Sequence, residues 1–317
     1  MKISISKSDF LSSNNRNKIK VKNYNLNKEN LKAIVVVIHG MIESKEIYSE
    51  FAEFLALKGF GVITYDHIGH GESINTVDDR GFFANEEGYK YLVDDLKHVI
   101  SEAKKFNLPI FLFGHSMGSL VAREYVSSEN NDELDGLILS GTIGPQWAID
   151  GAIQFANFMV ESKGPRYRSR KLMKVVTAVS EWKFDDMKYS LEWSTRDRKY
   201  IEEIKADESV NYIFTAAGFK DIFTLVKNTG KKENIEKISK SLPILMVTGS
   251  DDILGENTEG VKRLYELYKN AGIKDITLNI YEKSRHALLN DLDKLKVSKD
   301  ISDWMDIVLY ANNDKSL

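Results

Sequence analysis

The segment 114–118, Gly-His-Ser-Met-Gly, matches the pattern G-x-S-x-G. It follows an apolar run that predicts a strand, Ile110–Gly114, and leads into a helix predicted over Met117–Ser127. In this context the glycines permit a tight strand-to-helix turn that presents a serine hydroxyl above the sheet. The pattern also arises by chance in glycine-bearing turns, but the flanking strand and helix favour Ser116 as a nucleophile.

A serine hydroxyl is a weak nucleophile, so a base must take its proton and a carboxylate must orient the base. The chain has six histidines. His286 follows the last predicted strand and precedes the final helix, which is where the chain order Ser, Asp, His places the base. We therefore predict His286 as the general base.

The other five histidines are predicted to have different roles. His39 follows a strand and should support a turn, and His67 and His70 should shape a glycine-rich loop. His98 is expected to be exposed on a helix. His115 is next to the nucleophile in sequence but is expected to point elsewhere.

The orienting acid should follow the strand Pro243–Thr248, where two adjacent carboxylates, Asp251 and Asp252, occur. Neighbouring side chains point in different directions, so one of the two should face the base. The residues alone leave this choice open. Asp66 and Glu72 have the wrong position in the chain and are predicted to order a loop instead.

The tetrahedral intermediate of acyl transfer needs backbone N–H groups that donate to its oxyanion. By position, the predicted donors are the N–H groups of Met41, which follows a strand-ending His-Gly, and Met117. Their side chains matter less than their backbone.

Short β-branched runs alternate with longer amphipathic stretches, which is typical of an α/β fold with a mostly parallel sheet flanked by helices. The remaining predicted strands are Lys2–Ser6 and Lys18–Tyr24 as antiparallel edge strands, Ala33–His39, Val62–Asp66, Leu137–Ser140 and Ile276–Tyr281. The remaining predicted helices are Glu46–Leu57, Glu87–Phe106, Thr258–Ala271 and Lys299–Tyr310.

Residues 142–240 interrupt this alternation, because they contain no apolar β run and are helical in pattern and rich in aromatic side chains. We predict a catalytic core formed by residues 1–141 and 241–317, and a helical cap formed by residues 142–240. Trp147, Phe155 and Phe158 are candidates to line a pocket for an acyl chain, although such aromatic residues more often form the core of the cap itself. A basic cluster in this segment either approaches anionic lipid headgroups or is simply solvated; its members are Lys163, Arg166, Arg168, Arg170, Lys171 and Lys174.

Composition excludes several classes of function. The 317 residues carry a net charge of −3, so no basic field exists to hold nucleic acid. The chain has no cysteine, which excludes disulfides and thiol chemistry. No H-E-x-x-H spacing occurs, and a metal site at Asp66, His67 and His70 is only a weak alternative; we predict no metal and no organic cofactor.

The sequence also suggests where the protein works. The N-terminus lacks the apolar stretch of a signal peptide, and the longest apolar run is too short to span a bilayer. We expect a cytoplasmic protein with at most peripheral membrane contact, and the richness in Lys, Asn and Ile hints at a bacterial genome. The oligomeric state is left open.

With these residues placed, the chain resembles the lysophospholipase and monoacylglycerol lipase-like branch of the α/β hydrolases. The resemblance covers nearly the whole chain, through the segments VIHGMIESKEIY, YDHIGHGES, RGFFANEEGY, FGHSMGS, LILSGT, FTAAGF, GSDDILG and YEKSRHALLNDL. It implies that the acid is the third residue after the strand-ending glycine, which is Asp252, and that a helical cap covers the site. Ala287 and Ile68 depart from the residues common in relatives.

The resemblance implies a serine hydrolase for carboxylic esters, acting on small, lipid-like monoacyl substrates. One alternative is another carboxylesterase or an aminopeptidase on the same fold, because fold does not fix substrate. A peptidase would need acidic groups in the cap to bind a free amine, and Glu161, Asp185, Asp186 and Glu192 are candidates. A non-catalytic binding protein is the remaining alternative, which a complete Ser, Asp and His set disfavours.

Overall fold

The computed structural model describes residues 2–128, 133–181, 191–210 and 212–314. Its centre is an eight-stranded sheet with the order β1-β2-β4-β3-β5-β6-β7-β8. The strands are β1 (Ile5–Leu11), β2 (Lys18–Tyr24), β3 (Ile34–Ile38), β4 (Gly61–Tyr65), β5 (Ile110–His115), β6 (Gly136–Ser140), β7 (Ile244–Gly249) and β8 (Ile276–Tyr281). Only β2 pairs antiparallel, with β1 and β4, so the predicted mostly parallel sheet is confirmed.

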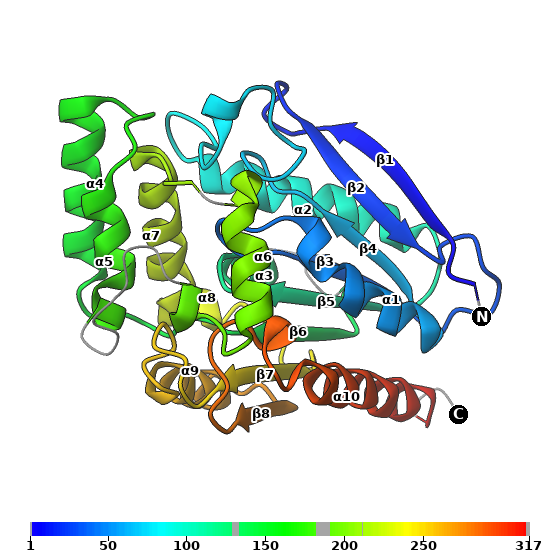
Figure 1. The fold of residues 1–317 in the computed structure, drawn as a ribbon. Helices are drawn as coiled ribbons and strands as arrows, with labels where there is room; N and C mark the ends of the chain where they lie inside the picture. The colour runs from blue at the N-terminus through cyan, green and yellow to red at the C-terminus, as the bar shows by residue number, and fades with distance from the viewer. Residues whose placement is uncertain (1, 129–132, 182–190, 211, 315–317) are drawn as a thin grey trace.

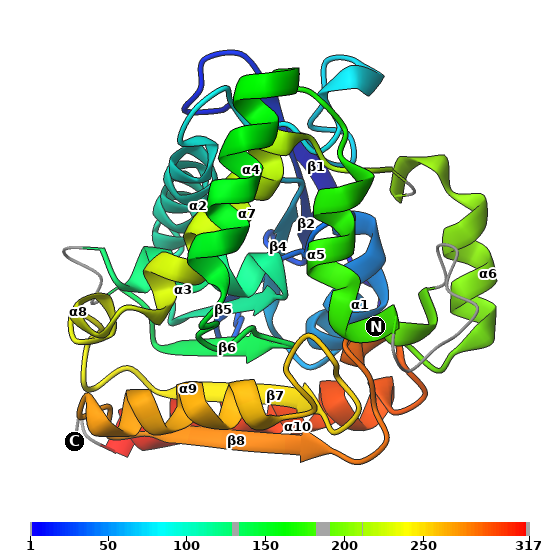
Figure 2. The ribbon, with the colours of Figure 1, turned by 90° about the vertical axis from the view of Figure 1, so that its left-hand side faces the viewer.

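Helices cover both faces of this sheet (Figures 1 and 2). They are α1 (Ser49–Leu57), α2 (Gly88–Lys104), α3 (Met117–Val126), α4 (Ile149–Lys163), α5 (Arg170–Glu181), α6 (Arg198–Ala206), α7 (Ala216–Gly230), α8 (Lys232–Ile235), α9 (Glu259–Asn270) and α10 (Lys294–Asp314). A short 3-10 helix, Lys45–Tyr48, precedes α1. Among the described residues, no helix has both the length and the apolar character needed to cross a membrane.

The central strands are buried on both faces, which explains why they read as unbroken apolar runs. In β3, Ile34, Val36 and Ile38 belong to one hydrophobic cluster, whereas Val35 and Val37 belong to a second. Successive side chains of a strand point to opposite faces of the sheet. The first cluster packs against α2, α3, α7 and α9, and the second packs against α1 and α10.

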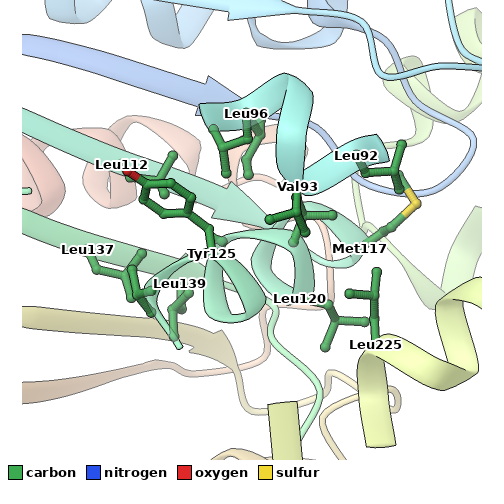
Figure 3. Packing of buried hydrophobic residues seen from close by; sticks show 14 of the residues in the cluster. Leu92, Val93, Leu96, Leu112, Met117, Leu120, Tyr125, Leu137, Leu139 and Leu225 are labelled. Atoms are coloured by element: carbon green, nitrogen blue, oxygen red, sulfur yellow. The ribbon is translucent and has the colours of Figure 1, made fainter. Parts of the chain in front are cut away.

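The first cluster fixes the helix that follows the candidate nucleophile. Figure 3 shows Leu120 and Tyr125 of α3 packed between residues of α2, β5, β6 and α7. Leu120 is fully buried and Tyr125 is 2% exposed. Burying such side chains contributes about 1.5–3 kcal/mol each, so the position of α3 relative to the sheet is strongly determined.

In its described residues, the segment between β6 and β7 contains helices joined by loops and no strand, apart from an isolated bridge between Arg168 and Thr215. Figure 1 shows α4 and α5 at the end of the molecule away from the two chain termini. α4 packs against α7, and α7 packs in turn against α2 and α3. α7 is therefore part of the layer that covers the sheet, and the division into a core and a cap at 142–240 stays a prediction.

Two predicted elements differ from the structure. β1 covers Ile5–Leu11, not Lys2–Ser6, and β2 is not an edge strand because it pairs on both sides. The helix predicted over Glu46–Leu57 is split into a 3-10 turn and α1.

Candidate active site

Ser116 lies between the end of β5 and the start of α3, with φ 50° and ψ −119°. Residues other than glycine rarely adopt this region, and such strain of about 1–3 kcal/mol persists only where the surroundings impose it. Here the Ser116 N–H donates to Ser140 O at 2.9 Å, and Ser119 Oγ donates to Ser116 O at 2.6 Å. The turn at Ser116 is therefore held from both sides.

The two glycines of the motif are required by close packing. A Cβ at position 118 would lie 2.6 Å from the carbonyl oxygens of Ile38 and His39. A Cβ at position 114 would lie 2.7 Å from the carbonyl oxygen of Gly118. Any larger residue would push α3 away from β3 and β5 and displace Ser116.

His286 and Asp252 form a buried pair. His286 Nδ1 lies 3.0 Å from Asp252 Oδ1 and 2.9 Å from Oδ2. The Asp252 carboxylate is fully buried and also accepts the N–H groups of Leu254 and Gly255, at 3.0 and 3.2 Å. Of the two carboxylates left open by the sequence, Asp252 is the one that contacts the histidine, whereas Asp251 is exposed.

The loops that carry this pair are tied together. The Asp251 N–H donates to Ser284 O at 3.0 Å, and the Ser250 N–H donates to Tyr281 O at 2.9 Å. With Nδ1 directed at Asp252, the other ring nitrogen, Nε2, is buried and has no hydrogen-bond partner among the described residues. Ser116 and His286 line the same cavity.

The protonation of His286 is set by its neighbours. Burial lowers the pKa of the imidazole, but the charge and hydrogen bond of Asp252, and then the charge of Glu43, raise it, and the net shift of the His286 pKa is upward. By contrast, burial lowers the pKa of His115 to about 4, so His115 is neutral near pH 7. The pair with Asp252 is therefore suited to stabilise an imidazolium once His286 gains a proton.

The cavity has a volume of about 760 Å³ and a mostly apolar wall. Its apolar lining comes from the loop after β3, from α3, from α5 and from the segment before α6, and includes Met41, Ile42, Met117, Leu120, Met173 and Trp193. The Trp193 ring centroid lies 5.4 Å from that of His286. An apolar cavity with a few convergent polar groups is typical of a small-molecule site.

Trp147, Phe155 and Phe158, the aromatic residues predicted to line the substrate pocket, are not part of the described cavity wall. Trp147 is 96% exposed and Phe158 is 60% exposed, because both face away from the packed side of the segment. Phe155 packs against the first hydrophobic cluster. The aromatic lining comes instead from Trp193, Tyr200 and Tyr212, which the sequence pattern did not distinguish.

The turn that follows β3 passes directly beside the nucleophile. A Cβ at Gly40 would lie 3.1 Å from Ser116 Cβ. Met41 and Met117 both line the cavity next to Ser116. The two predicted oxyanion donors are thus brought to the nucleophile, and the role of their N–H groups stays a prediction.

The contacts of His39 and His115 test what the sequence predicted for these two histidines. His39 supports the turn as predicted, since its Nδ1 lies 2.8 Å from Gly40 O and its Nε2 accepts the His67 N–H at 3.0 Å. The prediction for His115 is wrong: its ring centroid lies 4.8 Å from that of His286, and it lines the cavity. Because the chain turns sharply at Ser116, His115 stays at the strand end, beside His286.

Asp66 and Glu72 order the loop after β4. The Asp66 carboxylate is fully buried and accepts the Lys45 N–H and Nζ, both at 2.7 Å, and the Glu72 N–H at 2.8 Å. Lys45 Nζ also lies 2.5 Å from Glu72 Oε2. In the part of the chain that the structure describes, no three His, Cys, Asp or Glu side chains are grouped to hold a metal ion.

Several known proteins are similar to this chain. Residues 29–293 match the family model described as serine aminopeptidase, S33. The phospholipase YtpA of Bacillus subtilis is 29% identical over 231 residues, which is 73% of this chain and 80% of that protein. The monoglyceride lipase homolog of monkeypox virus is 28% identical over 281 residues, which is 86% of this chain and 89% of that protein.

A solved structure has the same fold. The thermostable carboxyl esterase from Bacillus coagulans, solved in complex with glycerol, superposes with a TM-score of 0.88 at 22% identity, covering 96% of this chain and 99% of that one. Together these matches confirm the predicted α/β-hydrolase fold, the predicted resemblance and the prediction of an ester hydrolase. With a family model matched over residues 29–293, the chain belongs to the serine aminopeptidase S33 family.

Proposed function

We propose that this protein hydrolyses the carboxylic ester of single-chain lipids, such as lysophospholipids or monoacylglycerols, through an acyl-serine at Ser116. The observation that carries the proposal is the buried Asp252–His286 pair, which opens with Ser116 into one apolar cavity. The relatives named as a phospholipase and as monoglyceride lipases support the substrate class. A cytoplasmic location remains a prediction from the sequence.

The mechanism uses each of these groups in turn. Ser116 Oγ attacks the ester carbonyl while His286 Nε2 takes its proton, and Asp252 holds Nδ1–H and stabilises the imidazolium. The N–H groups of Met41 and Met117 donate to the oxyanion of the tetrahedral intermediate. The alcohol leaves with the proton from His286, and water then attacks the acyl-serine by the same route.

An aminopeptidase must bind a free amine, and the carboxylate in the described cavity lining is already engaged in the protein. In the described lining, Glu43 is the carboxylate, and it accepts hydrogen bonds from Gly40 and Tyr48. Glu161 and Glu192 are exposed and do not line the cavity, and Asp185 and Asp186 lie outside the described residues.

The proposal is tested with a fluorophosphonate probe. We expect the purified protein to carry the adduct on the peptide that contains Ser116 and to hydrolyse short-chain p-nitrophenyl esters. Ser116→Ala should lose both the adduct and about 10⁴-fold or more of the turnover, because no nucleophile remains.

Ser162→Ala on the exposed surface of α4 is the matched control and should behave like the wild type. An adduct on another residue, or ester turnover retained by Ser116→Ala, would show that Ser116 is not the nucleophile. Faster turnover of aminoacyl amides than of acyl esters would favour the peptidase.

A further inference from the structure

The turn that follows β3 contains a strained residue beside the nucleophile. Ile42 has φ 59°, and a β-branched side chain is a rare occupant of this region. Such a conformation costs about 1–3 kcal/mol and persists only where neighbouring contacts impose it. The turn from Gly40 to Glu43 therefore needs a group that holds it closed.

Glu43 is that group. Its Oε2 accepts the N–H of Gly40 at 2.6 Å, so the side chain closes the turn back onto its first residue. The same oxygen accepts the hydroxyl of Tyr48 at 2.8 Å, which ties the turn to the start of α1. The side chain is only 14% exposed, and hydrogen bonds to a charged acceptor that is shielded from water are among the stronger ones.

The turn held by Glu43 lies directly beside Ser116. A Cβ at Gly40 would lie 3.0 Å from Glu43 Oε2 on one side and 3.1 Å from Ser116 Cβ on the other. Met41, whose N–H is the proposed oxyanion donor, is the next residue in the chain. A shift of this turn therefore changes the distance between the Met41 N–H and the carbonyl oxygen of the ester that Ser116 attacks.

We propose that Glu43 is a positioning residue, whose carboxylate holds the Gly40–Glu43 turn in the shape that presents the Met41 N–H to the oxyanion. This inference rests on the proposed function. Glu43 acts through the backbone of its own turn and does not itself exchange a proton with the substrate. Its second oxygen, Oε1, lies 3.7 Å from His115 Nε2, so the carboxylate also faces the histidine pair of the site.

The charge of Glu43 gives the proposal a readout that simple structural support would not give. The described titratable groups that face His286 are Asp252 from the loop after β7, Glu43 from the loop after β3 and His115 from the end of β5. Because Glu43 is negative, removing its charge should lower the pKa of His286. His286 must be neutral to act as the base. The acid limb of the pH profile of kcat/KM should therefore move to lower pH in a variant that lacks the charge of Glu43.

The experiment compares Glu43→Gln and Glu43→Ala in the full chain with a soluble p-nitrophenyl ester. Glu43→Ala removes the acceptor of Gly40, and we expect kcat to fall by about 10²-fold with little change in KM, as when an oxyanion donor is lost. Glu43→Gln keeps an amide oxygen that can accept the Gly40 N–H, so a smaller loss of about tenfold is expected, together with the downward shift of the acid limb.

Glu50→Gln in the first turn of α1 is the matched control, because its side chain is 65% exposed and pairs with Lys294 at the surface. It should keep the wild-type kcat and pH profile. If both Glu43 variants lower only the melting temperature and leave kcat and the acid limb unchanged, the positioning role is refuted. If Glu43→Ala does not fold, the isosteric Glu43→Gln decides the question alone.

A different result would refute the proposed ester hydrolysis itself. Wild-type protein that turns over no ester, or whose turnover survives Ser116→Ala, would remove the chemistry itself, and the inference would fall with it. Wild-type turnover that depends on Ser116 but is insensitive to Glu43 would overturn only the role of Glu43.

Discussion

Asp251 and Asp252 are neighbours in the chain but have opposite environments. Asp252 is fully buried and holds His286 Nδ1, whereas Asp251 is exposed and shares a local contact with Ser250. The pair therefore offers a test of the orienting acid in which the control lies one residue away.

We expect Asp252→Asn to lower kcat by about 10⁴-fold, because an amide in this position no longer holds the productive tautomer or stabilises the imidazolium. Asp251→Asn should stay close to the wild type. Steady-state kinetics on one ester, with melting temperatures to show that both variants fold, measures the difference. Equal losses in the two variants would argue against Asp252 as the orienting acid.

Ser116 and His286 could be proposed from the sequence, because the motif around Ser116 has a defined backbone and His286 comes between the last predicted strand and the final helix. Strand position did not separate Asp252 from Asp251, and only the family resemblance selected Asp252. Glu43 could not be proposed from the sequence, because its contacts depend on a turn with Ile42 at positive φ, which no pattern predicts. Trp193 was likewise indistinguishable from Trp147 in sequence. One lies beside His286 and the other is 96% exposed, a difference that depends only on tertiary packing.

The strands show why some elements are predictable. β3, β5 and β7 are buried along their whole length, so an apolar run identifies them to within one or two residues. β1 has six exposed residues and one half-buried one, and without an apolar pattern its position was predicted several residues too early. The final helix, α10, starts at Lys294, five residues before its predicted start.

The loops at the ends of β3 and β4 bury three histidines against one another. The His39 ring centroid lies 4.7 Å from that of His67 and 4.9 Å from that of His70. Burial lowers the pKa of His39 to about 4 and of His70 to about 3, and it lowers the pKa of His67 well below its usual value. All three are therefore neutral in the folded protein near pH 7.

We expect this cluster to make the protein sensitive to acid. The unfolded chain takes up protons on these histidines near pH 6.5, whereas in the folded chain the pKa is about 4 for His39 and about 3 for His70, and that of His67 is also well below its usual value. The free energy of unfolding should therefore be highest above about pH 6.5 and fall as the pH drops from there toward 4. Urea unfolding at pH 7 and pH 5 measures the loss.

His67→Leu should reduce this loss, because the ring nitrogens of His67 have no hydrogen-bond partner among the described residues and its titration is simply removed. The readout is the difference between the two pH values, so a packing cost common to both cancels. His98→Gln, on the exposed face of α2, is the control and should keep the wild-type difference. An unchanged difference in His67→Leu would contradict the role of the cluster.

At the scale of the whole molecule, the basic residues between 163 and 174 have different environments. Arg166 stacks on Phe82 at 3.8 Å and pairs with Asp79, and Arg168 donates to the carbonyl oxygens of Arg80 and Ile213. These two arginines therefore anchor α5 to the loop that precedes α2. Lys163 and Lys171 are exposed and do not line the described cavity wall.

Arg170 and Lys174 of α5, with Lys205 of α6, line the cavity and are exposed at the same time. Glu43 is the carboxylate of the described wall, and its oxygens are directed at its own turn and at His115. Lys205 pairs with Glu202 at 3.4 Å, so the cationic side chains that we expect to act on a substrate are Arg170 and Lys174 of α5. Positive charge at the cavity wall favours a substrate whose headgroup is an anion.

We expect a lysophospholipid with an anionic headgroup, such as lysophosphatidylglycerol, to have a lower KM than the monoacylglycerol with the same acyl chain. Both substrates should have an acyl chain short enough to stay monomeric in solution, so that micelles and membranes do not affect the measured KM. The double variant Arg170→Ala, Lys174→Ala should raise KM for the anionic substrate by about fivefold, since exposed ion pairs contribute up to about 1 kcal/mol each, and should leave KM for the neutral one unchanged. The double variant Lys163→Ala, Lys171→Ala changes the net charge equally but not the cavity wall, and it should change neither KM. Equal KM values for the two substrates in the wild type, or equal effects of the two double variants, would show that the headgroup is not read by these side chains.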